Sequence, residues 1–345
     1  MTAPEPPEDQ PGKRASGRDL DRAIVGAAPV FTAPEAAEVS GVDPVVARRL
    51  WRAFGFPEYG DAVAFSQPDV LALDTLVGTV EAGSIDLDTA VNLTRAMGQT
   101  MARLADWQVA SLLSRVEELA RESAEREDVG TGRIAAAMAL LAELEGPFED
   151  LMIYAWRRHL AAAAARVAAL SSVPGTEDEA GSGRVGRLTV GFADMVAFTS
   201  LSNSLREDRI GDLVEVFESR CADVVAGQSG RIIKSLGDSV LFVNDDPVRA
   251  VETAEGIIAM IGRDPRMPEV RLGLATGSVV MRLGDVFGPP VNLAARLTAV
   301  ARRNRVIIDT ATAELLPQDV FETRRLPGRP VRGFGIVEPL AVRRH

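Results

Sequence analysis

The chain has 345 residues, of which 46% are hydrophobic and 25% charged, and its formal net charge is -11. This composition is typical of a globular protein large enough for two domains, and the negative charge argues against broad electrostatic attraction to nucleic acid or anionic lipid. The single cysteine, Cys221, excludes an intrachain disulfide and fits a reducing compartment. We expect it to be a small buried hydrophobic residue.

The N-terminal segment lacks the apolar core of a signal peptide, and no apolar stretch reaches the ~20 residues that a membrane helix needs. We therefore expect a cytoplasmic protein without a membrane span. Residues 1–18 are rich in proline and charge, which predicts a disordered tail. A second break, residues 171–186, is rich in Ser, Gly, Pro and acidic residues and predicts a flexible linker.

Residues 19–170 predict an all-α domain, because apolar residues recur at three- and four-residue spacing and strand-like alternation is absent. The domain ends in a long connecting helix, residues 147–170, which is rich in alanine, a strong helix former. This helix is either a spacer or an element that carries movement between domains. His159 lies on it, and histidine titrates near physiological pH, which motivates the hypothesis of a protonation switch. An exposed histidine without a role is the alternative.

Within this helical region, residues 31–57 are similar to the helix-turn-helix opening of MerR-type regulators. A short helix and a glycine turn precede a second helix that carries Arg48, Arg49 and Arg52, and such a helix would suit a DNA major groove. Aromatic residues interleave with these arginines, so the same helix would also pack well inside a bundle. Both interpretations stay open, with DNA binding the less favoured because acidic residues surround the segment.

Residues 187–345 alternate between strand-like and helix-like patterns. They predict an α+β fold, a ferredoxin-like βαββαβ core with its helices on one face of the sheet. The expected strands are residues 187–195, 231–235, 239–243, 270–280 and 305–309, and the expected helices are residues 208–228, 247–262 and 289–301.

Two acidic residues stand where apolar strands end. Asp194 interrupts an apolar run, and an unpaired carboxylate on a buried strand is costly, so we expect it at the strand end with a cation as partner. A helix N-cap is the alternative for this residue. Asp238 follows a glycine in the turn of the hairpin "RIIKSLGDSVLFV", four residues after Lys234. Two carboxylates on adjacent strand ends suit a hard cation such as Mg²⁺, and beside a nucleoside triphosphate such a site can run two-metal chemistry.

A third polar stretch is "GDVFGPPVNLAARL". Asp285 precedes a turn, and Asn292 and Arg296 lie four residues apart, so they share one face of the following helix. An amide and a guanidinium on one face suit a phosphate or ribose contact. The alternative is a solvated helix face on which Arg296 pairs with a carboxylate.

The three stretches, in this order and at these separations, resemble the catalytic domain of class III nucleotidyl cyclases over residues 187–342. The resemblance implies that Asp194 and Asp238 bind two metal ions, Mg²⁺ or Mn²⁺, with the backbone carbonyl of Met195 as a further ligand. It also assigns the remaining roles: Lys234 and Asp285 read adenine, Asn292 orients the ribose, Arg296 stabilises charge on the α-phosphate, and Arg332 contacts phosphate near Phe334, where the family often has a lysine.

The resemblance further implies a homodimer, with the aspartates of one copy facing the Lys, Asp, Asn and Arg of the other, and conversion of ATP to 3′,5′-cyclic AMP and pyrophosphate. The helical region is similar to the autoinhibitory domain of soluble actinobacterial adenylyl cyclases, which implies regulation through the connecting helix and a pocket for lipid or fatty acid. A non-catalytic cyclase-like module that binds nucleotide or dimerises a regulator is the alternative. Lys234 and Asp285 disfavour a guanylyl cyclase.

Overall fold

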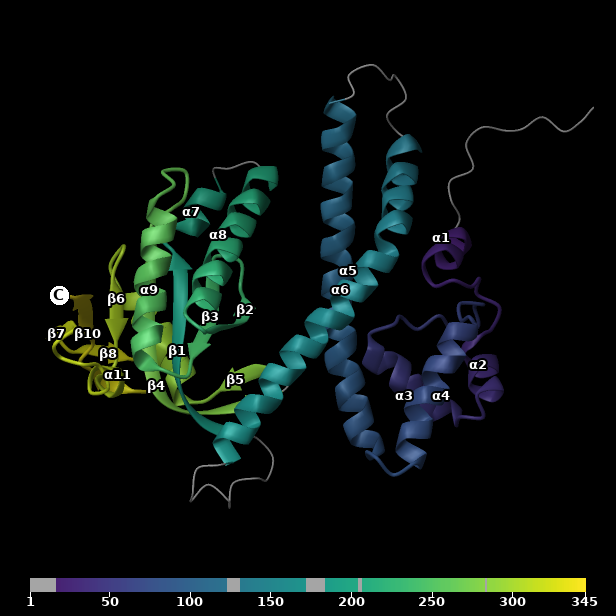
Figure 1. The fold of residues 1–345 in the computed structure, drawn as a ribbon, viewed down its shortest axis with the longest axis horizontal. Helices are drawn as coiled ribbons and strands as arrows, with labels where there is room; N and C mark the ends of the chain where they lie inside the picture. The colour runs from purple at the N-terminus through teal and green to yellow at the C-terminus, as the bar shows by residue number, and fades with distance from the viewer. Residues whose placement is uncertain (1–16, 123–130, 172–183, 204–206, 283) are drawn as a thin grey trace, which may run out of the picture. The chain divides into compact units, whose positions relative to one another are not determined.

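The computed structural model describes residues 17–122, 131–171, 184–203, 207–282 and 284–345. The predicted tail, residues 1–18, and the predicted linker, residues 171–186, fall mostly outside the described residues. The chain forms two compact units, Met1–Ala162 and Ala163–His345, and each is described by itself (Figure 1). In the described ranges, no helix combines the length and the apolar character needed to cross a membrane.

The described part of the first unit is built from helices, as the sequence predicted, with loops between them and one isolated β-bridge between Phe31 and Phe65. Its core gathers around Leu50 and Trp51, which pack with Leu73 and Val91 from two other helices. The ring of Trp51 lies 4.3 Å from that of Phe65. The helices are α1 (Gly17–Ile24), α2 (Ala33–Val39), α3 (Pro44–Phe54), α4 (Gln67–Glu81), α5 (Leu87–Glu122) and α6 (Thr131–Ser171).

The helix-turn-helix-like segment corresponds to α2 and α3. Asp43 caps α3 by accepting hydrogen bonds from two backbone N–H groups of its first turn. Arg49 pairs with Asp88 at 2.6 Å, and Arg52 pairs with Glu58. Trp51, between these arginines, is buried in the core. Because carboxylates of the same unit engage two of the three arginines, the geometry favours the interpretation in which α3 packs inside a bundle.

The connecting helix is longer than predicted. α6 begins at Thr131 and runs through Pro147, so the expected start near Pro147 is wrong. An internal proline removes one backbone donor and disfavours helix, but the alanine- and leucine-rich turns on both sides are strong helix formers. His159 is exposed on this helix, and its switching role stays a hypothesis.

The second unit is built on one mixed sheet, and its class, α+β, is the one predicted. The described strands of this sheet follow the order β2-β3-β1-β4-β6-β10-β7, with β5 on β4, and a separate hairpin joins β8 and β9. Neighbouring strands are antiparallel except β4 and β6, which are parallel. The strands are β1 (Arg184–Met195), β2 (Arg231–Ser235), β3 (Ser239–Asn244), β4 (Val270–Arg282), β5 (Asp285–Phe287), β6 (Val306–Ile308), β7 (Phe321–Arg325), β8 (Arg329–Val331), β9 (Gly335–Val337) and β10 (Leu340–Arg344).

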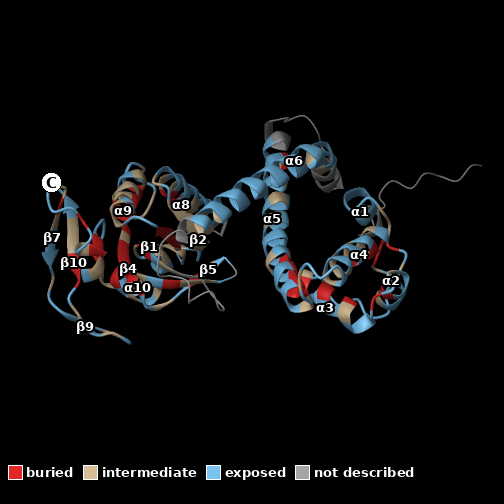
Figure 2. Cartoon of the chain, turned by 60° about the horizontal axis from the view of Figure 1, so that its bottom comes forward, coloured by how far each residue is buried: buried red, intermediate tan, exposed pale blue. Residues whose placement is uncertain are grey.

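Helices cover both faces of this sheet, so the expectation of helices on one face is wrong. The helices are α7 (Phe198–Ser202), α8 (Glu207–Gly227), α9 (Pro247–Gly262), α10 (Pro289–Val300) and α11 (Thr310–Ala313). α8 and α9 pack on the face that carries Phe242 and Leu272, whereas α10 packs on the opposite face, against Val190 and Leu241 (Figure 2). The central strands carry apolar residues on both faces, and each face therefore needs a covering layer.

Cys221 is one of the core residues of α8. Its side chain is fully buried against the sheet, as predicted. Burial, together with the charge of Glu218, raises the pKa of the Cys221 thiol to about 12. The thiol therefore stays protonated and packs as a small apolar group.

Gly273 of β4 lets α10 approach the sheet closely. A Cβ at this position would lie 2.3 Å from the backbone nitrogen of Thr298 and 2.6 Å from the carbonyl oxygen of Ala294. We expect Gly273→Ala to lower the free energy of unfolding by about 1–3 kcal/mol because the helix must shift, as measured by urea unfolding followed by circular dichroism. Gly262→Ala in α9 is the matched control, since nothing lies within 4 Å of its Cβ position. An equal loss in both variants would contradict this packing.

Candidate active site

Asp194 and Asp238 meet at the ends of neighbouring strands. Asp194 is the penultimate residue of β1 and pairs in register with Ser239, the first residue of β3. The Met195 N–H donates a hydrogen bond of 2.9 Å to the Asp238 carbonyl oxygen, which ties the two segments together. Both aspartates are half-buried. The structure thus brings together the two carboxylates that the sequence placed on adjacent strand ends.

A tight turn presents Asp238. Gly237 has φ +78°, a left-handed conformation that favours glycine. Leu236 donates its N–H to the carbonyl oxygen of Ser239 at 2.8 Å, which closes the turn. On the other side of the site, Ala197 also adopts a left-handed conformation, with φ 59°, where the chain leaves β1 for α7. Ala197 rather than Asp194 precedes this helix, so the N-cap alternative for Asp194 is wrong.

Arg271 is the cation partner that Asp194 requires. It lies directly across from Asp194 in the β1–β4 ladder. Its Nε and Nη2 atoms lie 2.7 Å and 2.6 Å from Asp194 Oδ2, and its Nη1 donates to the carbonyl oxygen of Ala299 at 3.2 Å. Sequence reasoning called for such a cation but did not identify it, because the register that joins residues 77 positions apart is not visible in the sequence.

The electrostatics of the site favour a bound cation. Burial raises the pKa of Asp194 above its ordinary value, the hydrogen bond and charge of Arg271 lower it, and the neighbouring charge of Asp238 raises it again, with a net upward shift. A half-buried carboxylate beside a second carboxylate is stabilised by a divalent ion between them.

The residues present fit a hard divalent cation that has further oxygen ligands. In the described ranges, no group of three or more His, Cys, Asp or Glu side chains gathers at one place. Two carboxylates alone do not complete the six oxygen ligands of Mg²⁺, so water or substrate phosphate must supply the rest. The Met195 side chain is buried in the core, and only its backbone carbonyl could serve as a ligand.

Lys234 and Asp285 form a second polar pair. Lys234 Nζ on β2 lies 2.6 Å from Asp285 Oδ2 on β5, although 51 residues separate them in the sequence. Their side chains are 38% and 28% exposed, so both remain accessible to a ligand. Lys234 therefore pairs with Asp285 rather than with Asp238. The two charged residues of the hairpin belong to different polar pairs, because Asp238 lies beside Asp194.

The remaining predicted residues lie apart from these pairs. Asn292 and Arg296 are exposed on α10, and Arg332 is exposed in the turn between β8 and β9. Among the described contacts of a single copy, none joins these three residues to the aspartates. The same contacts include no ion pair for Arg296, contrary to the alternative in which a carboxylate engages it.

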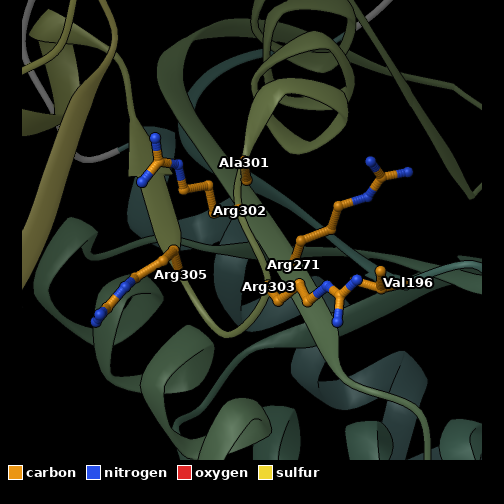
Figure 3. Close-up of a pocket in the computed structure, with 6 residues that line it drawn as sticks. All are labelled: Val196, Arg271, Ala301, Arg302, Arg303 and Arg305. Atoms are coloured by element: carbon orange, nitrogen blue, oxygen red, sulfur yellow. The ribbon is translucent and has the colours of Figure 1, made fainter.

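A basic pocket adjoins Arg271, the partner of Asp194. Its volume is about 560 Å³, and Arg271 connects it to Asp194. Figure 3 shows Arg271 and Arg303 extending to the side of Val196, and Arg302 and Arg305 extending to the other side. Arg303 donates to Glu269 at 3.1 Å. Because four arginines line it, the pocket suits an anionic group. It is lined by Val196, Arg271, Ala301, Arg302, Arg303 and Arg305.

Comparison with known proteins identifies the family of the chain. Residues 181–340 match the family described as the adenylate and guanylate cyclase catalytic domain. The chain is 40% identical to an adenylate cyclase of Streptomyces coelicolor over 97% of its own length and 92% of the relative. It is 36% identical to an adenylate cyclase of Glutamicibacter nicotianae, over 93% and 80% respectively. A pH-sensitive adenylate cyclase of Mycobacterium tuberculosis is 30% identical, over 91% and 78%.

Among solved structures, the adenylyl cyclase CyaB from P. aeruginosa aligns with 47% of this chain and 96% of its own, at 25% identity and a TM-score of 0.42. The catalytic core of a rhodopsin-guanylyl cyclase aligns with 48% of this chain at a TM-score of 0.45. The relatives in sequence span both units of the chain, and they confirm the resemblance that the three polar stretches carried. The chain belongs to the class III adenylyl cyclase family.

Proposed function

We propose that the chain converts ATP to 3′,5′-cyclic AMP and pyrophosphate at sites assembled between two copies. The observation that carries the proposal is the pair of half-buried carboxylates, Asp194 and Asp238, fixed at adjacent strand ends beside a basic pocket. The sequence relatives named adenylate cyclase support ATP as the substrate.

Asp194, Asp238 and the Met195 carbonyl would hold Mg²⁺ or Mn²⁺, two ions per site. Bound ions would lower the pKa of the ribose 3′-hydroxyl and balance the charge of the triphosphate. The protein positions the two carboxylates through the Met195 N–H bond to Asp238 and the tight turn at Gly237. We assign no side-chain general base, because none of the predicted site residues is placed for that role.

Lys234 and Asp285 would read the purine. Adenine offers a ring nitrogen that accepts from Lys and an exocyclic amine that donates to Asp. The two side chains already lie within 2.6 Å of each other, so one base edge can meet both. Asn292 would orient the ribose, while Arg296 would stabilise the charge that develops on the α-phosphate. Arg332 and Arg271 would contact the other phosphates.

Two copies supply a complete site. Asn292 and Arg296 are exposed on the outer face of α10, where a second copy can approach them. In the proposed homodimer, Asp194 and Asp238 of one copy face Lys234 and the α10 residues of the other. A twofold dimer then has two equivalent sites.

We further propose that the N-terminal unit regulates the reaction, acting through α6, which contributes residues to both units. A lipid or fatty acid bound in the helical unit and a cytoplasmic location are part of this proposal. DNA binding has less support, because Arg49 and Arg52 are paired with carboxylates.

The direct test is a cyclase assay with ATP and with GTP in the presence of Mg²⁺ or Mn²⁺. We expect cyclic AMP from ATP and little cyclic GMP from GTP. Asp194→Ala should lower kcat at least about a hundredfold, because metal catalysis contributes several kcal/mol. Asp223→Ala, an exposed aspartate of α8, is the matched control and should leave kcat unchanged. A wild-type protein that makes neither product would support the non-catalytic alternative instead.

A further inference from the structure

The ion pair between Asp194 and Arg271 occupies half of the carboxylate that the proposed metal site needs. Both Nε and Nη2 of Arg271 point to the same oxygen, Oδ2, at 2.7 Å and 2.6 Å. The guanidinium is fixed from the other side by the Ala299 carbonyl oxygen, 3.2 Å from Nη1. The β1–β4 register holds both backbones opposite each other. The strand register and the Ala299 contact therefore hold this ion pair in place.

The ion pair with Arg271 limits how many oxygens of Asp194 are available to bind cations. Among the described contacts, none reaches Oδ1 of Asp194, so one cation could bind there beside Asp238. An ionised carboxylate has two acceptor oxygens, and it can bridge two cations by giving one oxygen to each. Here two N–H donors and a positive charge already occupy Oδ2. A second metal ion therefore competes with Arg271 for Oδ2.

Arg271 has an alternative partner only when an anion is present. It lines the basic pocket together with Arg303, which extends to the same side, and the two guanidinium groups would favour a phosphate there. Phosphate accepts hydrogen bonds from arginine at least as well as a carboxylate does. Arrival of a triphosphate would thus both attract Arg271 and free Asp194.

We propose that Arg271 acts as an internal counter-ion that keeps the metal site half closed until the nucleotide binds, so that metal and nucleotide bind with positive coupling. The proposal rests on the proposed function, because it takes Asp194 as a metal ligand. The coupling is reciprocal: whatever factor the nucleotide adds to metal affinity, the metal adds to nucleotide affinity. A purely structural role of the ion pair, holding β1 to β4, would affect stability without changing metal affinity.

The test is Mn²⁺ binding to the full chain without nucleotide, measured by the loss of the free-ion signal in electron paramagnetic resonance. We expect Arg271→Gln to bind Mn²⁺ about tenfold more tightly than wild type, because no charge-assisted pair has to be broken. Arg302→Gln removes the same charge from the same pocket without a contact to Asp194, and it should change the affinity by less than about twofold. Saturating 3′-deoxy-ATP lacks the attacking hydroxyl, and a protein-free blank corrects for the Mn²⁺ that the triphosphate itself binds. The gain in Mn²⁺ affinity on adding this nucleotide should be larger in wild type than in Arg271→Gln.

Thermal unfolding of each variant reports whether it folds, and Arg271→Lys, which keeps the charge but loses the two-pronged contact, gives a second measurement with an intermediate expected affinity. Equal Mn²⁺ affinity in wild type and in both Arg271 variants would overturn the counter-ion role, as would an equal gain in Arg302→Gln. Asp194→Asn separates this failure from a failure of the proposed site. If Asp194→Asn leaves Mn²⁺ binding intact, the metal site itself is misassigned.

Discussion

We expect that mixing Asp194→Ala protein with Arg296→Ala protein restores cyclase activity that neither variant has alone. In the heterodimer, one site combines both substitutions and the other combines the intact Asp194 of one copy with the intact Arg296 of its partner. If equal amounts exchange subunits at random, half of the dimers are mixed and each has one intact site of two, which gives about a quarter of the wild-type rate. The measurement is cyclic AMP formation after co-incubation or co-expression.

The matched control mixes Asp194→Ala with Asp238→Ala. Both carboxylates belong to the same half of the site, as the hydrogen bond from the Met195 N–H to the Asp238 carbonyl oxygen indicates. Every mixed dimer then has one defect in each site, so activity should stay at the level of the single variants. Recovery in this control, or none in the Asp194 and Arg296 mixture, would contradict a site shared between copies.

The second large effect concerns the choice of base. Replacing the purine-reading pair by Lys234→Glu together with Asp285→Cys should lower the ratio of kcat/KM for ATP to that for GTP by about two to three orders of magnitude. The physical reason is hydrogen-bond polarity: the ring nitrogen of adenine accepts from Lys234, whereas the corresponding N–H of guanine donates and needs an acceptor such as Glu. The measurement is initial rates with both nucleotides over a range of concentrations.

An ion pair elsewhere on the same unit provides the control for the Lys234 and Asp285 double variant. Arg343 pairs with Glu322 on neighbouring strands, with side chains 76% and 43% exposed. Arg343→Ala removes this surface pair and should leave the ATP to GTP ratio unchanged. A ratio that also stays unchanged in the Lys234 and Asp285 double variant would show that this pair does not contact the base.

Local patterns predicted most of the central fold. The helix over residues 247–262 has the predicted bounds, and the hairpin of β2 and β3 forms where the glycine turn placed it. The sequence did not predict β5, β8 and β9, which have three residues each, or β7 and β10, which have five each. Strands of this length carry too few residues for a period of two to stand out, and distant partners rather than local sequence stabilise them.

The prediction that helices cover only one face of the sheet was wrong for a related reason. β4 is apolar on both faces, with Leu272 towards α9 and Ala275 towards α10. A continuous apolar strand indicates burial on both sides, but the sequence does not say which helix covers which face. Gly273, whose missing Cβ admits α10, is recognisable as a close-approach position only once the register is known.

The sequence predicted which residues form the candidate site, but it did not predict all the contacts between them. Asp194 and Asp238 were predicted to be neighbours because each ends an apolar run, and the β1–β3 register places them so. Arg271 was missed because its importance comes from lying opposite Asp194 across two strands that are distant in sequence. The described contacts of one copy do not join the aspartates to Asn292, Arg296 or Arg332. In the proposed dimer, these residues would come from the other copy.

The most direct test of the shared two-metal site is a crystal structure of the full chain with Mn²⁺ and 3′-deoxy-ATP, with manganese located by its anomalous signal. The account predicts manganese between Asp194 and Asp238 of one copy, with the adenine held by Lys234 and Asp285 of the other copy across a twofold axis. Manganese bound away from both aspartates, or an adenine held by the same copy that binds the metal, would contradict it.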